Sequence, residues 1–139
     1  MLASIGYAAA YTGVGILLLV VGAFALDLLT PGRLARHIYE ERSANAAIAL
    51  AAGFLGQGAI AFTTIWTNAT GGFGRALGYT VVFGLLGVLL HVVAFVVLDL
   101  LTPGKLGATL MQVEFHPASL VTAAATLAVS AIIVASIWP

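Results

Sequence analysis

The sequence contains no cysteine and very little charge, since only 7% of its 139 residues are Asp, Glu, Lys or Arg. The absence of cysteine excludes disulfides and thiol chemistry. Soluble globular domains are about 25% charged, so this composition is not that of an ordinary soluble domain. The sequence also lacks a basic patch, a phosphate-binding loop, a dinucleotide-binding fingerprint and a serine-nucleophile motif. We therefore expect no nucleic acid as a partner and predict no catalytic residue, cofactor or metal site.

The chain is instead rich in hydrophobic residues, which make up 62% of it. They form four runs at residues 6–29, 45–67, 77–101 and 117–138. Each run has about the 20 residues that a helix needs to cross roughly 30 Å of hydrocarbon. The first run is too long for a signal peptide and follows no basic residue, so we expect it to be retained. The predicted fold is all-α, an integral membrane four-helix bundle in a single transmembrane domain at residues 1–139.

The basic residues predict an orientation in the membrane. Arg33, Arg36 and Arg42 lie in the first connection between runs, and Lys105 lies in the third. The second connection has only Arg75. Because cytoplasmic loops carry the excess of Lys and Arg, we expect a multi-pass protein of the bacterial inner (plasma) membrane with both termini outside the cytoplasm. The four basic residues of the first and third connections are predicted to contact lipid headgroups.

One stretch of the sequence occurs twice: "LDLLTPGRL" at residues 26–34 returns as "LDLLTPGKL" at residues 98–106. The same offset of 72 residues aligns Tyr7 with Tyr79 and Trp66 with Trp138. Apolar helices match by chance at Leu, Val and Ala, but not at Tyr, Asp, Pro and Trp together. We predict a duplicated helical hairpin, with one unit at about 6–67 and the other at about 78–139. Since each unit holds two spans, a pseudo-twofold axis along the membrane normal should relate them.

The first unit contains "LTPGRLARHIYEERSANAAIALAAGFLG", which combines a Thr-Pro turn, a short polar helix and an Asn followed by small residues. This pattern resembles the YjfL-like family of small bacterial inner-membrane proteins, which are built from two tandem two-helix units. The resemblance covers almost the entire chain and implies the fold and the location. The family has no established biochemical activity, so the resemblance implies no catalytic residue. The family repeats the Asn at its last helix, whereas this chain has Pro117 at the position equivalent to Asn45.

Asp27 and Asp99 each lie about one turn before the proline that ends an apolar run. A carboxylate at this place faces the negative end of the helix dipole and lies near lipid, so it needs a partner or a proton. In one interpretation, each aspartate accepts hydrogen bonds from its Thr-Pro-Gly turn or pairs with Arg33 or Lys105, which locks the hairpin. In the other, the two acids face each other in an ion or proton path.

The turn after the first run has two further predicted roles. Proline stops the incoming helix, and Thr30 is placed to cap a new helix that has Pro31 at its first position. Leu34 and Ile38, four residues apart among charged neighbours, predict a short amphipathic helix along the membrane interface.

His91 is predicted to lie near the middle of the third span, and its equivalent in the other unit is Leu19. One interpretation is a buried ring that is bonded to a neighbouring hydroxyl or carbonyl. The other is a proton relay or a substrate contact, because histidine is the side chain that titrates near neutrality. Gln57, on a helix of the other unit, is a candidate partner of His91.

The function predicted first is that of a non-enzymatic structural or accessory subunit of a membrane assembly or homo-oligomer. Four helices with short loops leave little room for an active site, and small residues suit close packing between helices. The predicted packing residues are Gly13, Gly15, Gly22, Gly53, Gly56, Gly58, Gly84 and Gly87. The alternative is an ion or proton channel or transporter that uses His91, Asp27 and Asp99. A third interpretation, a cofactor-dependent membrane enzyme, requires a cofactor for which no motif is present.

Overall fold

The computed structural model describes residues 2–138, and this part of the chain contains helices and no strand. The elements are α1 (Leu2–Leu29), α2 (Leu34–Tyr39), α3 (Ala44–Asn68), the 3-10 turn η1 (Ala69–Gly71), α4 (Phe73–Leu101), α5 (Leu106–Leu110) and α6 (Ala118–Ile137). The helices α1, α3, α4 and α6 are long and apolar enough to cross a membrane. The prediction of an all-α protein with four spans is confirmed, and the predicted ends of the spans are wrong by only a few residues.

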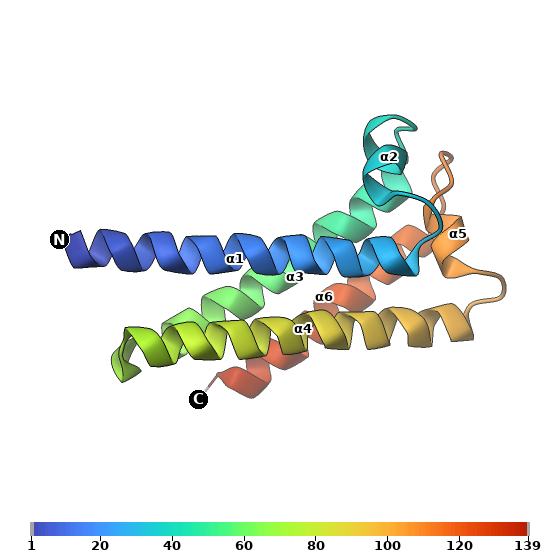
Figure 1. Ribbon diagram of the computed structural model, residues 1–139. Coiled ribbons are helices and arrows are strands. Elements are labelled where there is room, and N and C mark those ends of the chain that lie inside the picture. Colours follow the sequence, from blue (N-terminus) through green and yellow to red (C-terminus); the bar gives the residue numbers. More distant parts are fainter. Residues whose placement is uncertain (1, 139) are drawn as a thin grey trace.

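The four long helices form one bundle in which α3 is central. In Figure 1, α1 and α4 run side by side, and α3 and α6 cross behind them. The short helices α2 and α5 lie at one end of the bundle, called here the corner end, and both chain termini lie toward the opposite end. α3 contacts each of the other three long helices and contacts α6 most extensively. α1 is peripheral, since Leu18 is the one residue classed as buried among its 28.

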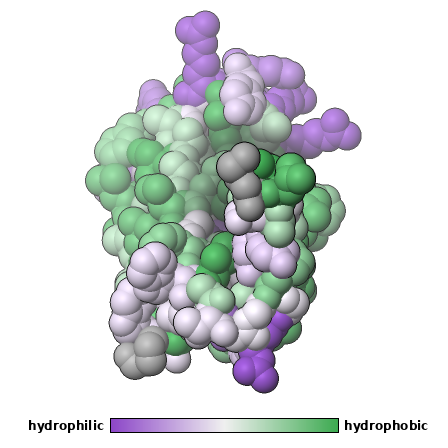
Figure 2. All heavy atoms as spheres, turned by 90° about the vertical axis from the view of Figure 1, so that its left-hand side faces the viewer, coloured by the Kyte–Doolittle hydropathy of each residue, from purple (hydrophilic) through white to green (hydrophobic). Residues whose placement is uncertain are grey.

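The outer surface of the bundle is hydrophobic. Figure 2 shows apolar residues over most of the visible face, with strongly hydrophilic residues gathered at its upper edge and at one place near its lower edge. Each long helix contributes large apolar side chains that are more than half exposed, such as Ile16, Phe62, Val82 and Ile132. A surface of this kind suits hydrocarbon as the surrounding solvent, because large contiguous apolar patches are rare on proteins in water.

Three glycines allow close approach between helices. A β-carbon at Gly56 would overlap Ser130 Oγ of α6, and one at Gly84 would overlap the Leu18 side chain of α1. At Gly87 it would lie 2.7 Å from Ile60 Cδ1. In lipid, where helices gain no hydrophobic free energy from meeting, such close packing is a main source of association.

Other glycines predicted to pack do not do so within this chain. A β-carbon at Gly13, Gly15, Gly53 or Gly58 would meet no atom within 4 Å outside its own helix. Gly22 has only an ordinary contact, at 3.7 Å from Val88 Cγ2. Packing within the chain is therefore confirmed for Gly56, Gly84 and Gly87, and packing of the open glycines against another chain stays a prediction.

Candidate functional site

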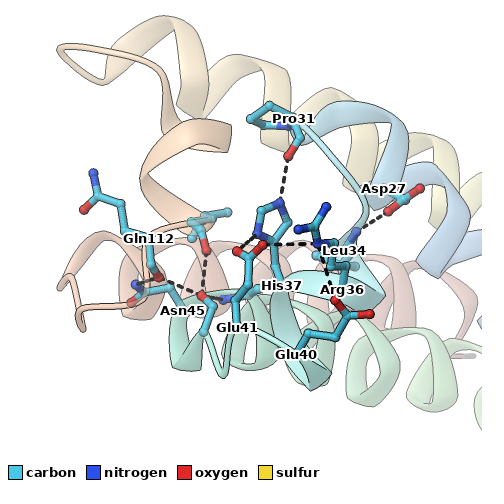
Figure 3. Close-up of polar contacts among 12 residues, drawn as sticks. Asp27, Pro31, Leu34, Arg36, His37, Glu40, Glu41, Asn45 and Gln112 are labelled. Carbon is cyan, nitrogen blue, oxygen red and sulfur yellow. Dashed lines mark hydrogen bonds and ion pairs between the residues drawn. The ribbon is translucent and has the colours of Figure 1, made fainter.

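Both aspartates hold the turn that follows them. Asp27 Oδ1 accepts a hydrogen bond from the backbone N–H of Leu34 at 2.5 Å, as Figure 3 shows. Asp99 Oδ1 accepts one from the N–H of Leu106 at 2.6 Å. In each case the donor is the first residue of the short helix after the turn. The carboxylate thus satisfies an N–H group that has no partner within that helix, which offsets its unfavourable place at the end of a long helix.

The rest of the turn also has the same geometry in both copies. The hydroxyls of Thr30 and Thr102 each donate to the carbonyl four residues earlier, at 3.0 and 2.7 Å. Gly32 and Gly104 have φ angles of +89° and +97°, which favour glycine. The expected threonine cap is wrong, because Arg33 is the N-cap residue of α2 and the proline lies within the turn. Each threonine hydroxyl thus bonds to the last turn of the preceding helix and does not cap the next one.

Charged side chains gather on α2 and just after it (Figure 3). Arg36 Nε lies 3.4 Å from Glu40 Oε2 and 3.5 Å from Glu41 Oε1. His37 joins this group to the turn, with Nδ1 2.6 Å from Glu41 Oε2 and Nε2 3.2 Å from the Pro31 carbonyl oxygen. Surface ion pairs of this kind contribute little to stability, about 0–1 kcal/mol each.

The remaining basic residues of the corner end are exposed. In residues 2–138 the ion pairs within 4.0 Å involve Arg36 and His37, so Arg33 and Lys105 do not pair with Asp27 or Asp99. Contact of these side chains with lipid headgroups stays a prediction. The described residues also hold no group of three or more His, Asp or Glu side chains that could bind a metal ion.

Asn45 fixes the connection between α5 and α6, a role that sequence reasoning missed. Its Nδ2 donates to the carbonyls of Gln112 and Glu114 at 3.0 and 2.7 Å, and its Oδ1 accepts from the N–H of His116 at 2.8 Å. The side chain is fully buried. Ser43 Oγ donates to the same Gln112 carbonyl at 2.7 Å. The departure from repeat symmetry at Asn45 was the one signal in the sequence, and it gave no indication of these partners.

His91 and Gln57 are hydrogen-bonded to different partners. His91 Nε2 lies 2.7 Å from Ser130 Oγ, and that hydroxyl donates to the Thr126 carbonyl at 2.8 Å. Because the serine hydrogen is used in this way, Ser130 Oγ accepts from the Nε2–H of His91. Gln57 Nε2 donates to the Gly84 carbonyl at 2.7 Å. The predicted pairing of His91 with Gln57 is therefore wrong, whereas the predicted hydroxyl partner of His91 is present.

His91 and Gln57 nevertheless line the same cavity, which has a volume of about 50 Å³ and lies between α1, α3, α4 and α6. Its other polar lining residues are Thr122 and Thr126, and the rest of the lining is apolar. Neither Asp27 nor Asp99 belongs to the lining. The structure thus brings two of the predicted polar residues together and leaves the two acids at their own turns.

Comparison with known proteins gives the family of this four-helix chain. Residues 1–137 match the family described as "Domain of Unknown Function (DUF350)". The chain belongs to the DUF350 family. It is similar to a "UPF0719 transmembrane protein" of Mycolicibacterium paratuberculosis, with 34% identity over 91% of this chain and 83% of that protein. Similar proteins of Mycobacterium bovis and Mycobacterium tuberculosis, also named UPF0719 transmembrane proteins, are 32% identical over the same shares of both chains. No solved structure matches.

Membership of DUF350 confirms the expectation of a transmembrane family with no activity assigned to it. The YjfL-like label, the duplication and the pseudo-twofold axis stay predictions. Within this DUF350 chain, the two turns share their hydrogen bonds, whereas His91 and Gln57 have apolar residues, Leu19 and Val129, at the offset of 72 residues. The candidate site for specific function in this family member is therefore the cavity at His91 and Gln57.

Proposed function

We propose that this DUF350 protein is a non-enzymatic helical subunit of the bacterial inner membrane that associates with further copies of itself through α1. The observation that carries the proposal is the exposure of α1. Leu18 is its one residue classed as buried, and β-carbons at Gly6 and Gly13 would meet no atom within 4 Å outside the helix. Because most of α1 is not covered by the rest of its own chain, its surface is available to pack against a helix of a second copy.

The exposed glycines belong to one stripe of small residues. Gly6, Ala10 and Gly13 follow one another at spacings of four and three, so they share a side of the helix. α1 contacts α4 through other residues, since Tyr7 and Tyr11 have ring centroids 4.4 and 5.5 Å from that of Phe73. The stripe therefore stays outside this contact. Small residues at this spacing let two helix backbones approach closely in lipid.

The channel or transporter alternative has less support. It requires Asp27, Asp99 and His91 to line one polar route, but each aspartate is bonded to its own turn and neither lines the cavity at His91. An enzymatic function has no support from the polar residues of this cavity, because His91, Gln57, Thr122 and Thr126 are each hydrogen-bonded within the chain.

The absence of native cysteine makes a crosslinking test clean. A single cysteine is placed at Ala10 on the stripe, and a matched single cysteine is placed at Ala8, which is exposed on another side of α1. After oxidation in native membranes, we expect a disulfide-linked dimer for Ala10→Cys and none for Ala8→Cys. A disulfide requires the two Cα atoms to approach within about 7 Å, so only residues at a twofold interface should react.

A second variant tests whether the small side chains matter. Gly13→Leu in the Ala10→Cys background should abolish the dimer, because the leucine side chains hold the two backbones apart. Equal crosslinking at both cysteine positions, or a crosslink that survives Gly13→Leu, would mean random collision. A chain that stays monomeric in lipid nanodiscs and forms no crosslink at Ala10 would rule out self-association through α1.

A further inference from the structure

The polar groups around the cavity between α1, α3, α4 and α6 are mainly hydrogen-bond acceptors. The hydroxyls of Thr122 and Thr126 donate to backbone carbonyls four residues earlier, both at 2.9 Å, so their oxygens keep only lone pairs. The Nε2–H of His91 is used on Ser130, which leaves Nδ1 of the neutral ring as an acceptor. In residues 2–138 the ring nitrogen with a partner at hydrogen-bond distance is Nε2, and the other neighbour that the ring contacts through hydrogen bonding is the Thr126 backbone of the same helix as Ser130.

Gln57 also lines the cavity, but its unpaired acceptor is turned toward Gly87 of α4 and is closed to water. Its side chain is 3% exposed, and its Oε1 is the buried side-chain atom in residues 2–138 that has no hydrogen-bond partner. Buried polar groups without a partner are rare in folded proteins, because each costs about 1–3 kcal/mol. The acceptors left for a ligand are Nδ1 of His91 and the hydroxyl oxygens of Thr122 and Thr126, so the cavity is complementary to a ligand that supplies a hydrogen-bond donor.

The size of the cavity limits what that ligand can be. One water needs roughly 10–15 Å³ of such volume, whereas a cavity that binds benzene measures about 150 Å³. The observed volume of about 50 Å³ therefore admits a hydroxyl group with a short piece of chain, but not a ring.

The surroundings of the cavity indicate where the ligand comes from. Its apolar lining includes Phe54, which is 39% exposed on the outer surface of α3, and Leu26 of α1, which is partly exposed. α1 and α3 are two of the membrane-spanning helices, so the side chains at this edge face hydrocarbon and not water. Access is thus from the bilayer, which favours an amphiphile over free water.

We propose that this cavity binds the hydroxyl end of a neutral aliphatic membrane alcohol. The hydroxyl donates to Nδ1 of His91, and the chain leaves past Phe54 into the bilayer. The proposal does not depend on self-association through α1, because the cavity lies within one chain.

The test uses the whole protein in lipid nanodiscs with ¹⁵N-labelled histidine, and the His91 resonance is assigned with His91→Gln. The probes are 1-octanol and octyl methyl ether, which differ in the donor hydrogen. We expect 1-octanol to shift the Nδ1 resonance of His91 to saturation and the ether to leave it unchanged. Equal responses to both probes, or no response to either, would overturn the proposal.

Two glycines of α3 provide a matched pair of variants. Gly53 lines the cavity and Gly58 does not, and a β-carbon at either position meets no atom within 4 Å. Gly53→Leu should weaken 1-octanol binding at least tenfold, whereas Gly58→Leu should leave it unchanged. If Gly53→Leu fails to fold, the comparison of 1-octanol with octyl methyl ether on the wild-type chain still tests the proposal. Magnetisation transfer from water protons to the His91 ring, together with no response to 1-octanol, would show that water occupies the cavity, and the proposal would then be wrong.

Discussion

Substitution of the two aspartates separates a structural role at the turns from a role in an ion path. Asparagine keeps an oxygen that can accept the hydrogen bond from Leu34 or Leu106, but it removes the charge that an ion path needs. Alanine removes both. In the structure each aspartate makes one such bond, at 2.5 Å for Asp27 and 2.6 Å for Asp99.

The expected free energies follow from these bonds. A hydrogen bond to a charged acceptor contributes about 1.5–3 kcal/mol to stability, and one between neutral groups contributes about 0.5–1.5 kcal/mol. A carboxylate in the last turn of a helix is disfavoured by about 0.3–1 kcal/mol, and a neutral amide is not. Asp27→Asn should therefore change the free energy of unfolding by less than about 1 kcal/mol, because the two effects offset each other. Asp27→Ala should lower it by about 2 kcal/mol, and Asp99→Ala by a similar amount.

Two measurements check this expectation. Unfolding in mixed detergent micelles with increasing dodecyl sulfate, followed by circular dichroism, gives the stability of each variant. Proton flux into liposomes is measured on the same preparations. The reasoning about the turns is refuted if asparagine destabilises the protein as much as alanine does. It is also refuted if wild-type protein conducts protons and Asp27→Asn abolishes the flux without a loss of stability.

Two further pairs of variants test the contacts of α3. Asn45→Ala removes three hydrogen bonds and should cost about 3 kcal/mol in dodecyl sulfate unfolding. Asn68→Ala, its control at the other end of the helix, removes two local bonds and should cost about 1 kcal/mol. Equal losses would contradict the role of Asn45. Gly56→Ala should lower stability by about 1–3 kcal/mol, because its β-carbon would overlap Ser130 Oγ. Gly58→Ala has open space and should change the thermal unfolding temperature very little, so similar effects at both glycines would argue against the crossing of α3 and α6.

The number and length of the spans could be predicted because the bilayer demands them. A span must form hydrogen bonds between its own backbone groups and cover about 30 Å, so an apolar run of about 20 residues is expected to form one transmembrane helix. The run predicted at 45–67 corresponds to α3 at Ala44–Asn68. The short helix α5 was not predicted, because Leu106 and Leu110 are four residues apart but have no charged residues between them, and the helix packs against α3, α4, α6 and the first turn. A β-carbon at Gly107 would lie 2.9 Å from the Leu29 carbonyl oxygen.

The inner faces of the long helices could not be predicted from this sequence. A soluble helix shows its buried face as an apolar stripe, but these helices are apolar on all sides. Gly56 and Gly58 look equivalent in the sequence, yet one contacts α6 and the other is open. The partners of Asn45 were hidden for a different reason. They are backbone groups 67 to 71 residues away, and backbone groups leave no signature in sequence.

The bonds made by Asp27 and Asp99 were foreseen as one of two interpretations because their partners are close in sequence. The hydrogen bond spans seven residues in both copies, so proline, glycine and aspartate specify it together. His91 differs, since its partner Ser130 lies on another helix and depends on how α4 meets α6. Contacts between residues close in the sequence can be inferred from their spacing, whereas contacts between helices can be inferred only once the packing of the helices is known.

The cavity is lined by an apolar residue of α1 and by a polar residue of α4 that occupy equivalent places in the predicted repeat. Leu19 and His91 are equivalent at the predicted offset of 72 residues, and both line it. Two identical copies would place either two leucines or two histidines there, and the walls would be apolar or polar on both sides. At these two positions the chain instead has an apolar wall on α1 and an acceptor on α4, which is the arrangement that the proposed alcohol requires. It follows that His91→Leu, which makes the two positions alike, should remove binding of an alcohol while the hydrogen bonds at both turns stay intact.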